Sequence, residues 1–370
     1  MPTEILADQH TNTFKKIFSG FPVKIECLKS NLTPREKSRI IESVQSGDTD
    51  ILIGTHSIIQ DNVRFLNLGL IIVDEQHKFG INQRALLTLK NSENPSIPHE
   101  LYLSATPIPR SLSLVLYEGL DYTIISESPK NRKTINTQMI DHDKRSILHD
   151  NISKILHDKE QVYWVCSCID YTESSESEYV QGVYEDLSNR FATTSIGMLH
   201  GRVDSKENIK TMKKFVSGEI QILVCTTMIE VGVDVANATC IVIEDPNRFG
   251  LSQLHQLRGR VGRSEKQSYC YLVCKNNLSD HALYRLKALE LNSSGFKIAE
   301  EDLKLRGSGD YLGHKQSGAN HNFKLATPDD ALNNYDLVRE SMNCVDKIDE
   351  ESKNKLIKRW GKDSAETIQL

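Results

Sequence analysis

The chain has 370 residues, of which 45 are basic and 50 acidic, so its formal net charge is −5. Apolar residues make up 38% and charged residues 26%, which is typical of a folded globular protein and excludes a disordered chain. The longest apolar stretch, residues 68–73, is far too short to cross a bilayer, and the N-terminus carries no secretory signal. We therefore expect a cytoplasmic protein of two or three domains, with no membrane partner.

The first recognisable elements are a helix and a strand between residues 33 and 53. Thr33-Pro34-Arg35-Glu36 has the pattern of a helix start, and Gly47 marks the end of that helix. The apolar run 51–53 follows. Short apolar runs between helices are typical of buried parallel strands.

Two carboxylates, Asp74 and Glu75, follow the next apolar run. A carboxylate at the C-terminal edge of a parallel strand faces the crevice in which α/β proteins bind ligands. One can hold Mg²⁺ through water while the other orients a hydrolytic water. The pattern alone is a weak signal, because strand ends often carry carboxylates. Ser104 and Thr106 follow a further strand at 101–103; their hydroxyls are able to bond the Asp-Glu loop, although the segment by itself also fits a Pro-rich turn.

The second part of the chain repeats the first. Residues 46–55 align with 217–226 at an offset of 171, and 73–80 align with 243–250 at an offset of 170. Asp204 and Glu207 open a helix equivalent to the one at Thr33. Two collinear matches within each copy indicate two α/β domains of related topology, with a boundary near 131–143.

An arginine cluster, 256–263, follows the second copy. Arg258, Arg260 and Arg263 alternate with glycines that let the backbone approach a ligand closely. Guanidinium groups suit the charge that develops on a transferring phosphoryl group, and a generic basic patch would not need the glycines. The cluster contrasts with residues 160–189, which carry seven acidic side chains and no Lys or Arg and fit a solvated surface.

Beyond residue 281 the sequence becomes polar and partly helical, with a glycine-rich stretch at 306–318 and charged helices at 337–360. The domain prediction is therefore 1–135, 136–280 and a smaller 281–370. The eight cysteines show no second ligand pair at zinc-site spacing, so we expect neither a disulfide scaffold nor a structural metal.

Together these motifs resemble superfamily 2 helicases, and among them the RecG family of ATP-dependent DNA helicases. The resemblance implies two RecA-like parallel-sheet domains, the first truncated at its N-terminus, and a small C-terminal helical hairpin region. The last region is similar to a translocation hairpin that the family shares with Mfd, the transcription-repair translocase. The matching segments are 2–7 (motif Ia), 54–56 (Ib), 74–77 (II), 104–107 (III), 226–234 (V), 253–263 (VI) and 296–318 (hairpin).

The resemblance also implies a role for particular residues, with ATP and Mg²⁺ as cofactors. Asp74 would hold the Mg²⁺, Glu75 would polarise the attacking water, and Arg260 and Arg263 would reach the γ-phosphate. The other residues would sense the nucleotide (His77, Gly232, Asp234, Gln256), couple hydrolysis to movement (Ser104, Thr106, Arg306, Gln316) or line the DNA backbone (Thr3, Thr55, His56, Thr226, Thr227).

The main departure of the sequence from the family is that it contains no Gly-x-x-x-x-Gly-Lys-Ser/Thr loop, because it begins inside motif Ia. Smaller departures are Ala236, Ser308 and His314-Lys315, the last of which alters the hairpin loop. We expect weak ATP binding, and a first domain that lacks the strand beside Asp74 and so exposes backbone and apolar surface.

The implied function is remodelling of stalled replication forks and Holliday junctions in DNA repair and recombination, by a monomer in the cytoplasm at the nucleoid. Branched DNA is the expected partner, together with a separate N-terminal half. The alternatives are a non-enzymatic DNA-binding remnant, half of a split enzyme and, more weakly, an Mfd-like translocase.

Overall fold

The structure, a computed structural model, describes the chain apart from residues 77–78, 80–82, 84–85, 88, 92–96, 105–122, 126, 128–131, 168–172, 201–204, 227–234, 276, 307–336, 338–347 and 361–370. Contacts divide the chain into two units: residues 1–105, 131–249 and 256–277 form the first, and 106–130, 250–255 and 278–370 the second. Two segments carry separate sheets, the first lobe (1–104) and the second lobe (132–275).

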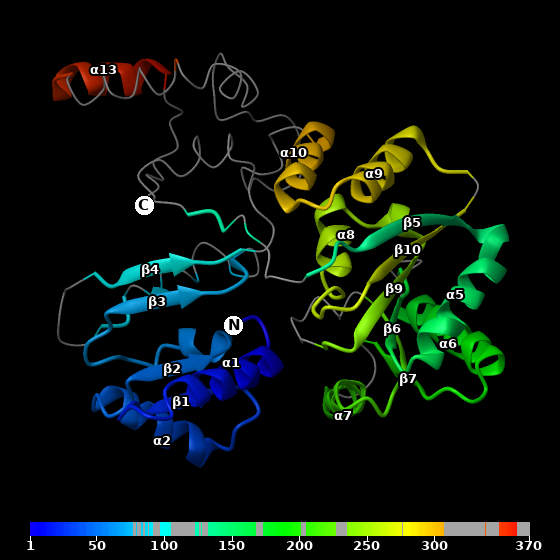
Figure 1. Cartoon of the computed structure of the whole chain (residues 1–370). Helices are drawn as coiled ribbons and strands as arrows, with labels where there is room; N and C mark the ends of the chain where they lie inside the picture. Colours follow the sequence, from blue (N-terminus) through cyan, green and yellow to red (C-terminus); the bar gives the residue numbers. More distant parts are fainter. Residues whose placement is uncertain are drawn as a thin grey trace. The chain divides into compact units, whose positions relative to one another are not determined.

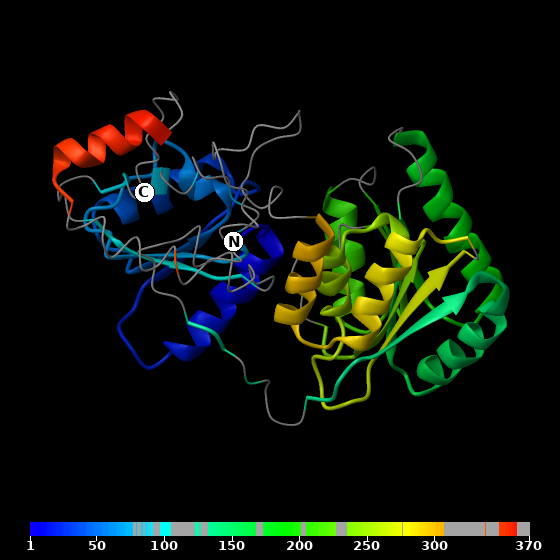
Figure 2. The same cartoon turned by 90° about the horizontal axis from the view of Figure 1, so that it is seen from above.

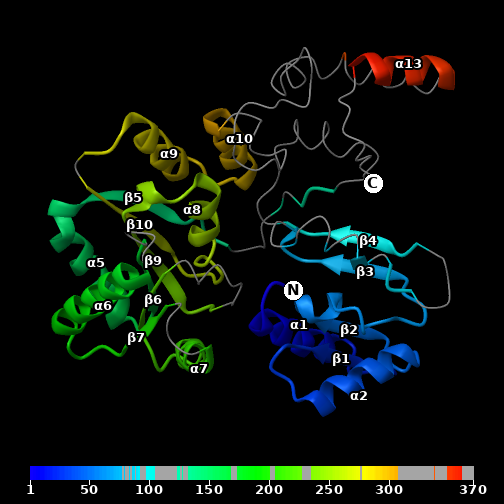
Figure 3. The same cartoon turned by 180° about the vertical axis from the view of Figure 1, so that it is seen from behind.

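The first lobe contains two separate pairs of parallel strands (Figure 1). Helix α2 starts as expected: Thr33 Oγ1 accepts a hydrogen bond from the Glu36 N–H at 3.3 Å, and Glu36 Oε2 accepts one from the Thr33 N–H at 2.9 Å. Helix α1 packs on the first strand pair (Figure 3). The elements are α1 (Glu4–Ile17), β1 (Ile25–Leu28), α2 (Pro34–Gln45), β2 (Ile51–Gly54), η1 (His56–Ile59), β3 (Leu70–Val73) and β4 (His99–Tyr102), paired as β1-β2 and β3-β4.

The second lobe is a six-stranded parallel sheet in the order β5-β10-β9-β6-β8-β7 (Figures 1 and 2). Its central strands are continuous apolar runs and are buried along their whole length, as expected for parallel strands covered on both faces. Side chains of α5 and α6 pack on one face. On the other face Phe215 of α7 contacts Tyr163. The elements are β5 (Asn136–Asp141), η3 (His142–Lys144), α5 (Arg145–His157), β6 (Gln161–Val165), α6 (Glu173–Arg190), β7 (Ile196–Leu199), α7 (Ser205–Val216), β8 (Ile222–Cys225), β9 (Ala238–Glu244), η5 (Pro246–Arg248), α8 (Leu251–Arg258) and β10 (Tyr269–Cys274).

The internal repeat is present in the backbone. The register of β1-β2 recurs in β7-β8 at an offset of 171 residues, and that of β3-β4 recurs in β9-β10 at an offset of 170. The glycine that follows α2 has a φ of +80° at Gly47, and its counterpart after α7 has +83° at Gly218. Glu75 and its counterpart Asp245 also share a positive φ, of +51° and +45°. The two lobes are therefore copies of one fold.

The lobes differ at one strand. In the second lobe β6 lies between β9 and β8 and joins the two repeated pairs into one sheet. Among the described residues of the first lobe, no strand joins β2 to β3. The predicted α/β fold with parallel sheets is confirmed.

Residues 278–370 contribute the described helices α9 (Asp280–Leu291) and α10 (Gly295–Arg306), which are next to each other in sequence, and the separate helix α13 (Glu350–Trp360). Ser279 caps α9 by accepting a hydrogen bond from the Ala282 N–H at 3.3 Å, and the Tyr284 hydroxyl of α9 donates to Glu301 of α10. The glycine-rich stretch that follows Arg306 lies outside the described residues. No helix in the described part of the chain is long and apolar enough to cross a membrane.

Candidate functional site

The Asp74–Glu75 pair lies at the carboxyl edge of β3, as the sequence indicates. Glu75 has a φ of +51°, a conformation that costs a non-glycine residue on the order of 1–3 kcal/mol and is concentrated at functional sites. Its N–H donates to Asp74 Oδ1 at 3.0 Å, which fixes the orientation of that carboxylate. Both side chains are half-buried. The pair is therefore held at the edge of the sheet and partly open to solvent.

A histidine that the sequence analysis missed lies beside this pair. His10 Nε2, on α1, is 4.0 Å from Asp74 Oδ2, so a protonated His10 would form an ion pair with that carboxylate. The two residues are far apart in the sequence, and no local pattern connects them.

Ser104 emerges at the same edge of the sheet. The N–H of Leu103 donates to the Val73 carbonyl at 2.8 Å, and the N–H of Gln76 donates to the Leu103 carbonyl at 3.0 Å. These two bonds tie the segment after β4 to the loop that carries the carboxylates. The structure thus brings Ser104 next to the loop of Asp74, whereas Thr106 and His77 lie outside the described residues.

Of the two candidate residues directly after β2, Thr55 is buried and His56 is exposed. Thr55 is only 8% exposed, and its hydroxyl lies 3.3 Å from that of Ser57. His56 is exposed and stacks on Phe79, with ring centroids 4.7 Å apart and planes inclined by 23°. Phe79 follows the carboxylate loop, so this stacking connects the segment after β2 to the segment after β3. Thr3 precedes α1 in extended backbone, with its Oγ1 buried.

In the second lobe, the segment after β8 holds the remaining candidate threonines. Thr226 is buried, and its N–H donates to the Leu199 carbonyl at 3.4 Å. Thr227, Gly232 and Asp234 lie outside the described residues, as does Gln316. Arg306 ends α10, and its side chain is likewise not described.

The arginine cluster contains buried and exposed members. Arg258 and Arg260 are only 4% and 5% exposed, and burial lowers the pKa of Arg258. Arg263 is exposed, and its Nε donates to the Gly259 carbonyl at 3.3 Å. Gln256, on α8, is half-buried. Of the two predicted γ-phosphate ligands, only Arg263 therefore presents its side chain to solvent.

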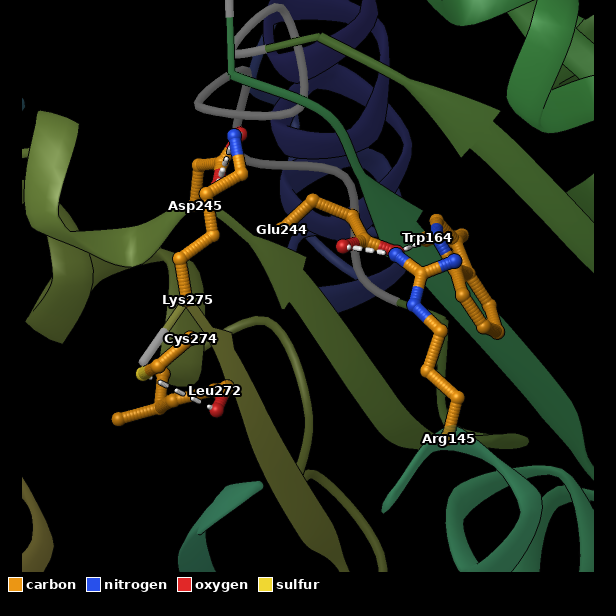
Figure 4. A network of polar contacts seen from close by, with 7 residues as sticks. All are labelled: Arg145, Trp164, Glu244, Asp245, Leu272, Cys274 and Lys275. Atoms are coloured by element: carbon orange, nitrogen blue, oxygen red, sulfur yellow. Dashed lines mark hydrogen bonds and ion pairs between the residues drawn. The ribbon is translucent and has the colours of Figure 1, made fainter. Parts of the chain in front are cut away.

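The counterpart of the Asp74–Glu75 pair in the second lobe is internally paired (Figure 4). Glu244 is only 2% exposed; it accepts from an Arg145 guanidinium nitrogen at 2.5 Å and from Trp164 Nε1 at 3.1 Å. Lys275 Nζ lies 3.3 Å from Asp245. Burial raises the pKa of Glu244, and the charge of Arg145 opposes that rise. The carboxylates of this pair are thus bound by the protein's own cations, whereas Asp74 and Glu75 are half-buried and partly open to solvent.

Comparison with known proteins agrees with this geometry. Residues 1–115 match the DEAD/DEAH box helicase family, 143–265 match the helicase conserved C-terminal domain, and 292–360 match the C-terminal part of domain 3 of the ATP-dependent DNA helicase RecG. Solved structures such as Mss116p bound to single-stranded RNA share the fold at 18% identity and a TM-score of 0.59, covering 83% of this chain and 66% of Mss116p. The fold and motifs of the chain are those of the superfamily 2 helicases.

Relatives with higher sequence identity identify the family within this superfamily. ATP-dependent DNA helicase RecG of Haemophilus influenzae is 41% identical over 318 residues, 86% of this chain and 46% of the relative. RecG of Escherichia coli is 39% identical over 363 residues, 97% of this chain and 52% of the relative. A solved RecG bound to a three-way DNA junction has a TM-score of 0.70 at 38% identity, with 91% of this chain and 42% of that chain covered. The chain belongs to the RecG family, whose C-terminal half it resembles, and it spans about half the length of these relatives.

Proposed function

We propose that the chain forms the motor part of a RecG-type ATP-dependent DNA helicase or translocase that remodels stalled replication forks and Holliday junctions in DNA repair and recombination. The observation that carries the proposal is the partly open Asp74–Glu75 pair, in a chain homologous to RecG helicases. A RecG structure that contains a three-way DNA junction supports branched DNA as the ligand. We expect a monomer that acts in the cytoplasm at the nucleoid.

For the nucleotide site, we propose ATP with Mg²⁺ bound near Asp74. The donor set fits the ion, because Mg²⁺ prefers carboxylate oxygens and water, and the Glu75 N–H already orients Asp74 Oδ1. When bound, Mg²⁺ would neutralise charge on the phosphate oxygens. Glu75 would orient the attacking water, and Arg263, the exposed member of the arginine cluster, would contact the γ-phosphate together with Arg260. The proposed nucleotide-sensing residues are His77, Gly232, Asp234 and Gln256.

For DNA, we propose contacts to the phosphate backbone, which do not depend on base sequence. The exposure of His56 and the stacking of its ring on Phe79 support such a contact. The other proposed DNA contacts are Thr3, Thr55, Thr226 and Thr227, and the proposed coupling residues are Ser104, Thr106, Arg306 and Gln316.

A second candidate function is DNA binding without hydrolysis. It is favoured by the sequence, whose 370 residues contain no Gly-x-x-x-x-Gly-Lys-Ser/Thr loop. Such a loop supplies backbone N–H groups and a lysine for the β- and γ-phosphates. We therefore expect the 370-residue polypeptide by itself to hydrolyse ATP slowly.

Binding of the purified chain to a three-way junction and to a linear duplex of equal length, followed by fluorescence anisotropy, tests the DNA proposal. We expect tighter binding to the junction and weaker binding by His56→Ala. The matched control is His157→Ala, which removes another exposed histidine, from α5. Equal affinity for both DNAs, or equal loss in the two variants, would contradict the proposal.

Junction-stimulated ATP hydrolysis distinguishes the two candidate functions. Hydrolysis that Glu75→Gln abolishes would show that the 370-residue polypeptide is an active enzyme. Junction binding with no hydrolysis above that of Glu75→Gln would support the non-hydrolytic role of the polypeptide by itself.

A further inference from the structure

Helix α1 brings the imidazole of His10 to the Asp74 carboxylate. His10 Nε2 lies 4.0 Å from Asp74 Oδ2, and both side chains are partly exposed. The other carboxylate oxygen, Asp74 Oδ1, accepts a hydrogen bond from the Glu75 N–H at 3.0 Å. The two oxygens of Asp74 therefore face different groups: Oδ1 faces the backbone of its own loop, and Oδ2 faces a side chain of α1.

The packing of α1 on the β1-β2 pair fixes the position of His10 (Figure 3). Ala7, one turn before His10, is fully buried and belongs to a cluster with Ile25 and Ile53. Phe14, one turn after His10, packs against the same cluster. Because α1 is anchored on both sides of His10, the imidazole is held by a rigid element of the fold, and such elements position functional groups more accurately than loops do.

The second lobe has a polar aromatic side chain at the same position of the corresponding helix. The seventh residue is His10 in α1 and Tyr179 in α6. Burial raises the pKa of the Tyr179 hydroxyl, and the negative charges of Glu244 and Asp245 raise it further. Those two carboxylates are the counterparts of the pair at the end of β3. The proximity of this helix position to the carboxylate pair is therefore found in both lobes.

The distance between His10 and Asp74 indicates how the imidazole can act. At 4.0 Å, Nε2 and Oδ2 are too far apart for a direct hydrogen bond. Mg²⁺ usually keeps several waters when a protein binds it through one or two carboxylates. An imidazole nitrogen beside the carboxylate can hydrogen-bond such a water, and outer partners of this kind tune the affinity for the metal. His10 is therefore suited to orient a metal-bound water.

We infer that His10 is a positioning residue of the metal site at Asp74, which it supports by hydrogen bonding to a water bound to the ion. The inference rests on the proposed function, in which Mg²⁺ binds near Asp74. It also gives α1 a role in the nucleotide site. The helix begins directly after Thr3, a proposed DNA contact, and His10 lies two turns further on. One anchored helix then connects the proposed DNA contacts to the metal site.

Mn²⁺ binding to the full 370-residue chain, followed by the electron paramagnetic resonance of the free ion, tests the inference. The site at Asp74 is the binding that Asp74→Asn removes. His10→Ala and His10→Phe, which keeps a ring but has no nitrogen, should each weaken this binding about 10–100-fold. His10→Gln should recover part of the loss, because its amide can hydrogen-bond a water. Asn12→Ala, the matched control, removes an exposed polar side chain from the same helix and should bind Mn²⁺ like the unmodified chain.

Urea midpoints of the variants separate a role in positioning from a role in folding. Weaker Mn²⁺ binding by His10→Phe at an unchanged midpoint, with partial recovery in His10→Gln, supports the inference. Equal Mn²⁺ affinity of His10→Phe and the unmodified chain would overturn it and leave the proposed function intact. So would a further loss when His10→Phe is added to Asp74→Asn, because His10 would then act at another site. Absence of any binding that depends on Asp74 would contradict the proposed metal site itself, and the inference with it.

Discussion

At the scale of single residues, the same position in the two lobes has opposite surroundings. Asp74 stays partly open beside His10, whereas Glu244 is buried between Arg145 and Trp164. A buried carboxylate is stable only when it is paired and hydrogen-bonded, so Arg145 is needed for the stability of the second lobe.

Arg145→Ala should therefore destabilise the second lobe by about 2–4 kcal/mol, because it leaves the Glu244 carboxylate buried without its cation. Urea unfolding followed by the fluorescence of the buried Trp164, with Trp360 replaced by Phe, measures the loss. Adding Glu244→Gln should recover part of the stability, since the amide carries no charge and still accepts from Trp164. No recovery would show that Arg145 acts through packing alone.

His149 makes the stability of the same lobe depend on pH. Burial, with Arg190 and Arg145 nearby, lowers its pKa to about 4, from a usual value of about 6.5. Between these values the unfolded chain binds the proton more readily, so stability is full above pH 6.5 and falls as the pH drops toward 4. His149→Phe keeps the ring beside Trp164 and removes the titration. The urea midpoint should change less with pH in His149→Phe than in the unmodified chain. Parallel plots of midpoint against pH for the two proteins would contradict this assignment.

At the scale of elements, two glycines with positive φ have different surroundings. Gly262 follows α8 with a φ of +76°, and a Cβ there would lie 2.9 Å from Ile135 Cγ1. Gly218 follows α7 with a φ of +83°, and a Cβ there would meet nothing within 4 Å. Glycine is therefore required at position 262 by both the backbone conformation and the lack of space for a Cβ, and at position 218 by the backbone conformation alone.

Gly218→Ala should cost about 1–2 kcal/mol for the left-handed backbone, and Gly262→Ala should cost more because the methyl group also meets Ile135. Thermal unfolding of both variants gives the comparison. Ile135→Val in the Gly262→Ala background should restore part of the difference. Equal losses in the two alanine variants would show that the side chain of Ile135 moves aside freely.

At the scale of the whole molecule, the two lobes share a fold but differ in the continuity of their described sheets. The second lobe buries Trp164, Tyr163 and Ile241 in one continuous six-stranded sheet. The described sheet of the first lobe consists of two separate strand pairs, and isolated pairs are marginally stable in water.

The amides of β1 to β4 should therefore exchange with solvent before those of β6, β8 and β9, because the first lobe opens at lower free energy. Hydrogen exchange measured by mass spectrometry on the 370-residue chain gives the order directly. Simultaneous exchange of both lobes would show instead that they unfold as one cooperative unit.

The sequence by itself determined the class of fold, the internal repeat and the position of the carboxylates. Local sequence patterns indicate these features: the capping pattern at Thr33, the apolar runs, and Asp74 directly after one of them. Repetition at a constant offset also fixes topology, because two similar sequences fold alike.

The tertiary structure decided which of the candidate groups are accessible. It buries Arg260 and exposes Arg263, although the two lie three residues apart in one motif. It also brings Arg145 to Glu244 across 99 residues of sequence, and His10 to Asp74. Burial and ion pairing depend on which elements pack together, and no local pattern of residues contains that information.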